Sequence, residues 1–559
     1  MGKKKTIIYQ LFPRLFTNSC DHCVVNGTKK QNGCGKMNDI TAPVLNKIRD
    51  LGITHVWYTG VIRHALKTHY NDIPSCNPYI VKGNAGSPYA ITDYYDIDPD
   101  IAVRVKNRIG EFQKLVERTH EAGLKVIIDF VPNHVARQYH SIAKPQQVED
   151  LGASDNKELA FSPDNNFYYM PGQQFAPSID LGQGQEFYCE KPAMATGNDC
   201  FHPYPGVNDW YETVKLNYGI DYTTGQRHFS PIPSTWNKML DILLYWAEKG
   251  VDGFRCDMAH MVPVEFWNWA IPQVKEAHPD VVFIAELYDL GIYRDYIFNG
   301  HFDYLYDKVS LYDTLRAVVT GNASAAAITH CWQAVEGIGD HMLNFLENHD
   351  EQRIASEQFA GDATRALPAL VVAATISRAP FMVYHGQELG EPARDAEGFS
   401  GSDGRTTIFD YWSVDTLRRW YNGGKCDISR LSKQERDLRR FYKTLLRLCN
   451  SQQAIACGDL YDLMYVNNDS VNADKVYAYY RHYNNERLLI VANFNDTDET
   501  VHINTPHHAF QVMNLEPGKY DCKELLTGQE QSLDIMPDKP ACFVVPRRNA
   551  VIFKLKNKA

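Results

Sequence analysis

The sequence lacks the features that identify a membrane protein or a disulfide-stabilised secreted protein. Its longest apolar run, Ala366 to Ile376, is far shorter than the roughly 20 residues of a membrane-spanning helix. Its 13 cysteines are odd in number and scattered over 559 residues, unlike a disulfide framework. The basic start, Met1 to Lys5, precedes an apolar stretch too short for a signal peptide. We therefore expect a cytoplasmic protein; the alternative is an exported one whose signal is not part of this sequence.

An excess of positive charge is also missing. The chain has 68 acidic and 57 basic residues, which gives a formal net charge of -11. Nucleic acids and anionic membrane surfaces attract basic proteins, so we expect neither as a partner, whereas a neutral sugar is compatible. With 44% hydrophobic and 22% charged residues the composition is globular, and the length predicts two or three domains.

Metal-binding patterns are sparse. Cys20 and Cys23 have the spacing of two zinc ligands, but no second pair follows at the usual distance. The sequence also has no Asp-rich loop of the EF-hand type. We therefore expect residues 18–38 to form a surface loop rather than a zinc site.

Four short apolar segments each end in a cluster of polar residues. In one of them Arg255 and Asp257 stand two positions apart, so on a strand they would share a face. A single Arg-x-Asp pattern is more often a structural ion pair than a catalytic site. The four clusters together raise the expectation of catalysis; they end the segments 126–134, 251–257, 282–286 and 343–350.

In this order, the clusters resemble the conserved regions of the α-amylase family of glycoside hydrolases. The similarity rests on DFVPNH at 129–134, GFRCD at 253–257, Glu286 after a strand, and ENHD at 347–350. It implies that Asp257 is the nucleophile, that Glu286 is the general acid/base, and that Asp350 stabilises the transition state.

The resemblance also implies an α/β fold built on a (β/α)8 TIM barrel, and the alternation of strand-like and helix-like segments agrees with it. After His134 this rhythm stops for about eighty residues, far longer than an ordinary loop, which predicts an inserted irregular domain after strand 3. From Ser451 onward short strands with turn signals predict a C-terminal antiparallel β-sandwich. The expected domains are the barrel (1–134 and 220–450), the inserted domain forming a wall of the substrate cleft (135–219) and the sandwich (451–559).

Four further residues are expected to bind substrate. The resemblance places Tyr89 under a bound sugar, and His134 and His349 lie within matched motifs, where they could donate hydrogen bonds to sugar hydroxyls. We expect Arg255 to orient Asp257 and to lower its pKa, keeping the nucleophile ionised.

No cofactor is expected for the chemistry, and a structural calcium ion is the one metal to consider. Asn133 matches a calcium ligand of many family members. Those members have a histidine four residues past the nucleophile, where this chain has Met261, with His260 one position early. The departure makes calcium binding doubtful.

We expect a retaining glycoside hydrolase that cleaves α-1,4-glucosidic bonds in starch-like glucans or maltooligosaccharides through a covalent glycosyl-enzyme. Lys215 stands where several subgroups that cleave α-1,6 bonds or short oligosaccharides carry an acid. Because a lysine near substrate could not accept protons from sugar hydroxyls, it favours α-1,4 over strict α-1,6 specificity. The alternatives are a transglucosylase or trehalose-forming isomerase on the same site, and a non-catalytic carbohydrate-binding relative.

Overall fold

The computed structural model describes residues 3–394 and 402–556. At its centre, eight parallel strands close into a barrel in the order β1-β16-β15-β14-β13-β12-β5-β2, which confirms the predicted TIM barrel. Four of these strands, β5, β12, β13 and β15, overlap the apolar segments that were predicted to end in polar clusters. The bounds of the eight strands are β1 Ile7–Leu11, β2 His55–Tyr58, β5 Lys125–Phe130, β12 Gly253–Cys256, β13 Val282–Ala285, β14 Tyr304–Tyr306, β15 Met342–Phe345 and β16 Phe381–Tyr384.

The strand side chains alternate between the barrel interior and the surrounding helices. Bulky residues fill the interior, among them Trp57, Ile127 and Ile284. The longer α-helices are α3 Ala42–Arg49, α4 Arg108–Glu121, α5 Ser234–Glu248, α6 Val264–Ala277, α10 Leu367–Thr375 and α12 Lys433–Ser451. The shorter ones are α1 Pro13–Phe16, α2 Lys29–Asn32, α7 Tyr293–Phe298, α8 Asp313–Val319, α9 Ile328–Ala334, α11 Asp415–Tyr421, α13 Gln453–Ala456, α14 Met464–Asn467 and α15 His507–Met513.

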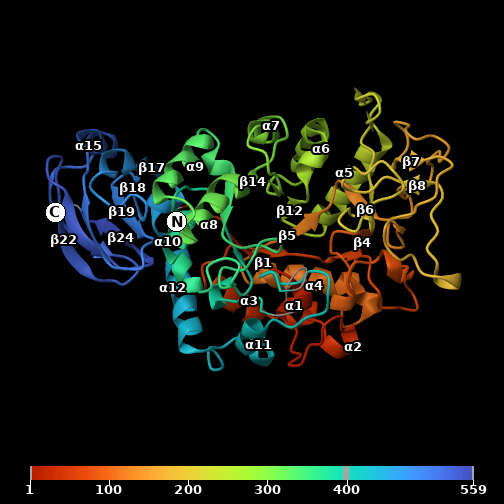
Figure 1. The fold of residues 1–559 in the computed structure, drawn as a ribbon, viewed down its shortest axis with the longest axis horizontal. Coiled ribbons are helices and arrows are strands. Elements are labelled where there is room, and N and C mark those ends of the chain that lie inside the picture. Colours follow the sequence, from red (N-terminus) through yellow and green to blue (C-terminus); the bar gives the residue numbers. More distant parts are fainter. Residues whose placement is uncertain (1–2, 395–401, 557–559) are drawn as a thin grey trace.

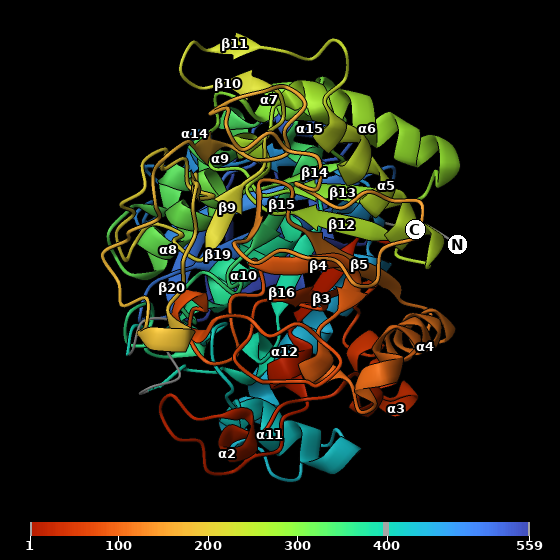
Figure 2. The ribbon, with the colours of Figure 1, turned by 90° about the vertical axis from the view of Figure 1, so that its right-hand side faces the viewer.

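Between β5 and α5 the chain leaves the barrel and contains no α-helix, in agreement with its Gly- and Asn-rich composition. Three antiparallel pairs organise it: β6 His134–Ala136 with β9 Thr213–Lys215, β7 Tyr169–Met170 with β8 Ala193–Met194, and β10 Ile220–Asp221 with β11 Gln226–Arg227. It has a small apolar core that includes Tyr168, Phe175 and Tyr188. Since the barrel pattern resumes at Ser234, the β10–β11 hairpin, uppermost in Figure 2, also lies outside the barrel. The domain boundary at 219/220 stays a prediction.

The predicted antiparallel C-terminal domain is confirmed. Its main sheet has the order β17-β18-β19-β24-β21-β22, and β20 pairs with β23 in a second sheet. Phe543 on β23 packs edge-on against Phe553 on β24, with ring centroids 5.1 Å apart, so that the two sheets share a core. The strands are β17 Asp459–Asp462, β18 Val476–Tyr483, β19 Glu486–Asn493, β20 Glu499–Ile503, β21 Gly518–Glu524, β22 Glu530–Ile535, β23 Ala541–Val545 and β24 Asn549–Leu555.

The C-terminal domain and the inserted segment lie at opposite ends of the molecule's long axis (Figure 1). Helix α10, which lies in the longest apolar run of the sequence, is buried from Pro368 to Thr375 because it packs against β15 of the barrel and against β19 and β24. Among the described residues no helix is both long and apolar enough to cross a membrane.

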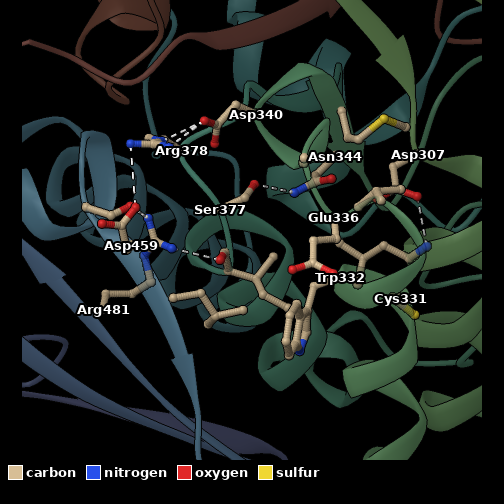
Figure 3. A pocket seen from close by; sticks show the side chains of 18 residues that line it. Asp307, Cys331, Trp332, Glu336, Asp340, Asn344, Ser377, Arg378, Asp459 and Arg481 are labelled. Atoms are coloured by element: carbon tan, nitrogen blue, oxygen red, sulfur yellow. Dashed lines mark hydrogen bonds and ion pairs between the residues drawn. The ribbon is translucent and has the colours of Figure 1, made fainter. Parts of the chain in front are cut away.

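A crevice of about 460 Å³ lies where the barrel meets the C-terminal domain (Figure 3). Arg378 bridges Asp340 at 2.7 Å and Asp459 at 3.6 Å, and buried Arg481 donates to the main-chain oxygen of Ile376 at 3.0 Å. Because these charged groups already bind one another or main-chain oxygens, they hold the two domains together. None of the predicted site residues lines this crevice.

Candidate active site

The predicted catalytic residues meet at the carboxyl end of the barrel strands. Asp257 follows β12, Glu286 follows β13, and Asp350 follows β15; parallel strands present these positions at the same end of the barrel. A cavity of about 300 Å³ opens there. Five predicted site residues line it: Tyr89, His134, Asp257, Glu286 and Asp350.

A single guanidinium group joins the two carboxyls beside this cavity. Arg255 Nη1 lies 2.7 Å from Asp257 Oδ1, and its Nη2 lies 2.8 Å from Glu286 Oε2. Arg255 is 1% exposed, and its Nε donates to the Tyr306 hydroxyl at 3.2 Å. It therefore lies beneath the cavity wall, where it orients the carboxyls and does not line the space open to a ligand.

Arg255 acts on the pKa of Asp257 in the expected direction, but the expected net result, a lowered pKa, was wrong. Burial and the neighbouring Glu286 carboxyl raise the pKa of Asp257 well above its usual range, although Arg255 acts in the opposite direction. The reason is that one guanidinium serves several carboxyls at once, including Asp129, whose Oδ1 lies 3.5 Å from Nη1. The Asp257 carboxyl therefore binds its proton more tightly than an isolated aspartic acid does.

Asp350 is held differently. Burial alone would raise the pKa of Asp350, but His349, Arg255 and Arg405 together outweigh burial and lower it. His349 Nε2 lies 2.9 Å from Asp350 Oδ2, and its Nδ1 lies 2.8 Å from Gln10 Nε2. Asp350 thus stays ionised more easily than Asp257.

Of the other predicted binding residues, Tyr89 and His134 line the cavity, whereas His349 is buried and does not. Tyr89 lines the cavity, and its hydroxyl lies 2.6 Å from Nε2 of His349, which is itself buried below the surface. His134 also lines the cavity, with its ring 5.2 Å from that of Trp210. Burial, reinforced by Lys215, lowers the pKa of His134 to about 3, so the imidazole is neutral near pH 7.

Comparison with known proteins identifies this arrangement. The family model described as alpha amylase, catalytic domain, matches residues 10–487. The chain belongs to the α-amylase family. It is therefore a glycoside hydrolase, an enzyme that acts on O-glycosyl bonds.

The sequence relatives are distant but cover most of the chain. Alpha-amylase 3 of Dictyoglomus thermophilum is 22% identical over 544 residues, which span 94% of this chain and 92% of the relative. Neopullulanase 2 of Thermoactinomyces vulgaris is 22% identical and covers 94% of this chain and 74% of its own length.

Solved structures share the fold. A maltogenic α-amylase from Thermotoga neapolitana superposes with a TM-score of 0.63 at 19% identity, covering 99% of both chains. An α-amylase from Geobacillus thermoleovorans, complexed with acarbose, gives the same TM-score, identity and coverage.

The residues around Asn133 do not fit the calcium ion that many α-amylase-family members carry there. Asn133 Nδ2 donates to the main-chain oxygen of Gly197 at 2.7 Å, and its Oδ1 accepts from Lys215 Nζ at 2.7 Å. Lys215 Nζ also lies 2.5 Å from Asp199 Oδ1. A positive ammonium group therefore occupies the position of a cation bound to the Asn133 oxygen, which corrects the assignment of Asn133 as a metal ligand.

The same contacts overturn the interpretation of Lys215 as a substrate-facing residue. Lys215 is 2% exposed and does not line the cavity. Its identity therefore says nothing about linkage preference. In the described ranges no three His, Cys, Asp or Glu side chains come together as a metal site, and the thiols of Cys20 and Cys23 contact main-chain oxygens.

Several cavity residues escaped the sequence analysis. Tyr288 donates to Glu286 Oε1, and the Met258 N–H donates to Glu286 Oε2 at 2.8 Å. The alternation that paired Arg255 with Asp257 also pairs Glu286 with Tyr288, so this signal was present. Thr213 begins β9, and the others come from loops with no local pattern: Lys82, Ser87, Trp210, Glu212, Ile408 and Phe409.

Proposed function

We propose that this α-amylase-family enzyme hydrolyses α-1,4-glucosidic bonds in starch-like glucans or maltooligosaccharides with retention of anomeric configuration. The observation that carries the proposal is the pair Asp257 and Glu286, held on the guanidinium of Arg255 at the wall of one cavity. Retention requires two carboxyl groups close enough to act on the same glycosidic bond, one as nucleophile and one as acid. Because Asp257 and Glu286 both contact the guanidinium of Arg255, their carboxyl groups meet this requirement of proximity.

In the first step the Asp257 carboxylate attacks the anomeric carbon while Glu286 gives its proton to the glycosidic oxygen, and the leaving sugar departs. In the second step Glu286 takes a proton from water, the water oxygen attacks the anomeric carbon, and the bond to Asp257 breaks. The mechanism requires Glu286 to carry a proton and Asp257 to be ionised when the substrate is bound. Because the pKa of Asp257 is raised, its ionisation is less favourable than that of an isolated aspartic acid.

The remaining residues act on the sugar ring. Asp350 is ionised, so it stabilises the positive charge that develops near the anomeric carbon. His134 is neutral and exposed to the cavity, so it can donate a hydrogen bond to a hydroxyl without adding charge. The ring of Tyr89 gives a sugar an apolar surface to pack against.

The relatives support an α-glucan substrate. Those found include α-amylases, a neopullulanase and a cyclomaltodextrinase, and one related structure is titled as a complex with maltose. The choice of α-1,4 over other linkages, and of water over a sugar acceptor, rests on the family resemblance. Cytoplasmic location likewise stays a prediction.

The test is a time course with maltoheptaose, isomaltotriose and trehalose at equal concentration, with all products resolved. We expect maltoheptaose to be shortened fastest, and proton NMR before mutarotation should show new ends in the α configuration. Products longer than the substrate would assign a transglycosylase, trehalose formation an isomerase, and β ends would overturn the double displacement.

A further inference from the structure

The ammonium group of Lys215 joins three parts of the chain in a buried position. Lys215 is the last residue of β9, in register with His134 on β6. Its Nζ donates to Asn133 Oδ1, at the end of β5, at 2.7 Å and pairs with Asp199, in the loop after β8, at 2.5 Å. The charge also lies 5.5 Å from the centre of the Tyr222 ring.

Main-chain bonds run beside the same contacts. The Lys215 N–H donates to Ala195 O at 2.9 Å, and the Leu216 N–H donates to Asn133 O at 2.9 Å. Asn133 is therefore bound through its main chain to the segment that follows β9, and through its side chain to Gly197 and Lys215. This is the inserted segment's attachment to the carboxyl end of the barrel.

A buried ammonium group is costly unless partners replace its hydration. Here one amide oxygen, one carboxylate and one ring face do so, and the lysine side chain is only 2% exposed. Removing the charge would leave Asn133 Oδ1 and Asp199 facing each other without a cation between them. The oxygens of Asn133 and Asp199 thus form a cation site, and the cation that fills it is the ammonium group of Lys215, a residue of the same chain.

We propose that Lys215 is the resident cation that fixes the inserted segment to the barrel in place of a metal ion, and that it positions the cleft wall. His134 follows Asn133 directly and lies opposite Lys215 in the β6–β9 pair, and its ring packs against Trp210. Both rings line the catalytic cavity. Lys215 is a positioning residue that reaches the substrate through these two side chains.

The experiment compares Lys215→Met, which keeps most of the side-chain volume without the charge, with Lys157→Met. Lys157 is an exposed lysine in the same segment, so the control loses the same charge. We expect Lys215→Met to be cut within residues 137–233 by a protease about tenfold faster than wild type. We also expect its KM for maltoheptaose to rise by about tenfold while kcat changes less than about threefold, because tenfold corresponds to 1.4 kcal/mol of lost positioning.

Asp199→Asn tests the same contact from the other partner, with Asp164→Asn, also exposed in this segment, as its control. Its effect should have the same direction and be smaller, and in the double variant with Lys215→Met it should add little, because the two changes remove one interaction. If Lys215→Met does not fold, Asp199→Asn by itself still tests the proposal. Additive effects would overturn the proposal.

The claim that Lys215 takes the place of a metal ion is tested on the wild type alone. After exhaustive chelation its thermal midpoint should stay within about 1 °C, and millimolar calcium should not raise it, because no cation is missing. A fall of many degrees that calcium reverses would overturn the proposal, as would proteolysis of Lys215→Met at the rate of Lys157→Met. Proteolysis and melting do not depend on the substrate, so the result stands even if the proposed α-1,4 activity fails; only the KM measurement rests on that function.

Discussion

At the scale of single residues, the site is organised by charge sharing around Arg255. Three carboxyls, Asp129, Asp257 and Glu286, lie within 3.5 Å of its two terminal nitrogens. The guanidinium cannot neutralise all of them, and burial prevents water from doing so. Burial and the excess negative charge together raise the pKa of Asp257.

This arrangement makes the two catalytic carboxyls separately essential. We expect Asp257→Asn and Glu286→Gln each to lower kcat by at least about a thousandfold while the protein stays folded, because each removes a different step of the double displacement. Circular dichroism and steady-state kinetics on maltoheptaose measure both properties. Cys256→Ala, at the fully buried position between Arg255 and Asp257, is the contrast: it should change stability more than rate. Turnover near that of wild type in either carboxyl variant would refute the assignment.

The raised pKa of Asp257 has a consequence for stability with a definite sign. The folded protein keeps a proton that the unfolded chain releases above about pH 4, so this residue lowers stability progressively as the pH rises from there. Asp257→Asn cannot ionise, so its melting temperature should exceed that of wild type by a margin that is near zero at pH 4 and grows toward pH 8. Asp164→Asn, at an exposed position, should show no such trend. A margin that shrinks with rising pH would contradict the raised pKa.

At the scale of elements, the position of Asp257 depends on how closely β12 approaches its neighbours. Gly253 begins β12, and a methyl group there would lie 2.6 Å from Val282 Cγ2 and 3.2 Å from Ile127 Cγ1, on the two adjoining strands. Such overlap forces strands apart in a closed barrel, where neither side can move freely.

We therefore expect Gly253→Ala to lower the free energy of unfolding by about 1–3 kcal/mol and to reduce kcat, because Arg255 and Asp257 follow on the same strand. Denaturant melts and kinetics test this. Gly339→Ala is the matched control, since its added methyl would meet only Val335 Cγ2 at 3.8 Å, an ordinary contact. Equal effects of the two substitutions would show that β12 tolerates the displacement.

At the scale of the whole molecule, the C-terminal domain is attached to the barrel by half-buried polar contacts as well as by α10. Asp462 Oδ2 accepts from Thr329 Oγ1 at 2.7 Å and from Trp332 Nε1 at 2.8 Å, both on α9, and from the Tyr477 hydroxyl at 2.8 Å on β18. One carboxylate therefore joins a barrel helix to the sheet.

Asp462→Ala leaves these three donors without their acceptor and should lower the free energy of unfolding by about 1–3 kcal/mol. Activity at low temperature should stay near that of wild type, because α9 and β17 lie on the other side of the barrel from β7 and β8 of the inserted segment (Figure 1). Asp469→Ala, at an exposed position nearby in the sequence, is the control for loss of a carboxylate. Unchanged stability in Asp462→Ala would show that apolar packing alone joins the domains.

The sequence by itself determined the barrel, the C-terminal sheets and the three carboxyl residues that meet at the cavity, because these depend on local patterns. Strand and helix periodicity, and motifs at the ends of parallel strands, carry this information within about ten residues. For the same reason Tyr288 was within reach, two positions after Glu286.

Only the tertiary structure decided the electrostatics and the role of Lys215. The pKa of Asp257 depends on burial and on Glu286, 29 positions away, and neither is visible in the tripeptide Arg255 to Asp257. Lys215 meets Asn133 across 82 positions, through a segment with few regular elements. Charges act through space and through the water that folding removes, so a motif can name the charged residues but the fold alone decides which of them share a partner.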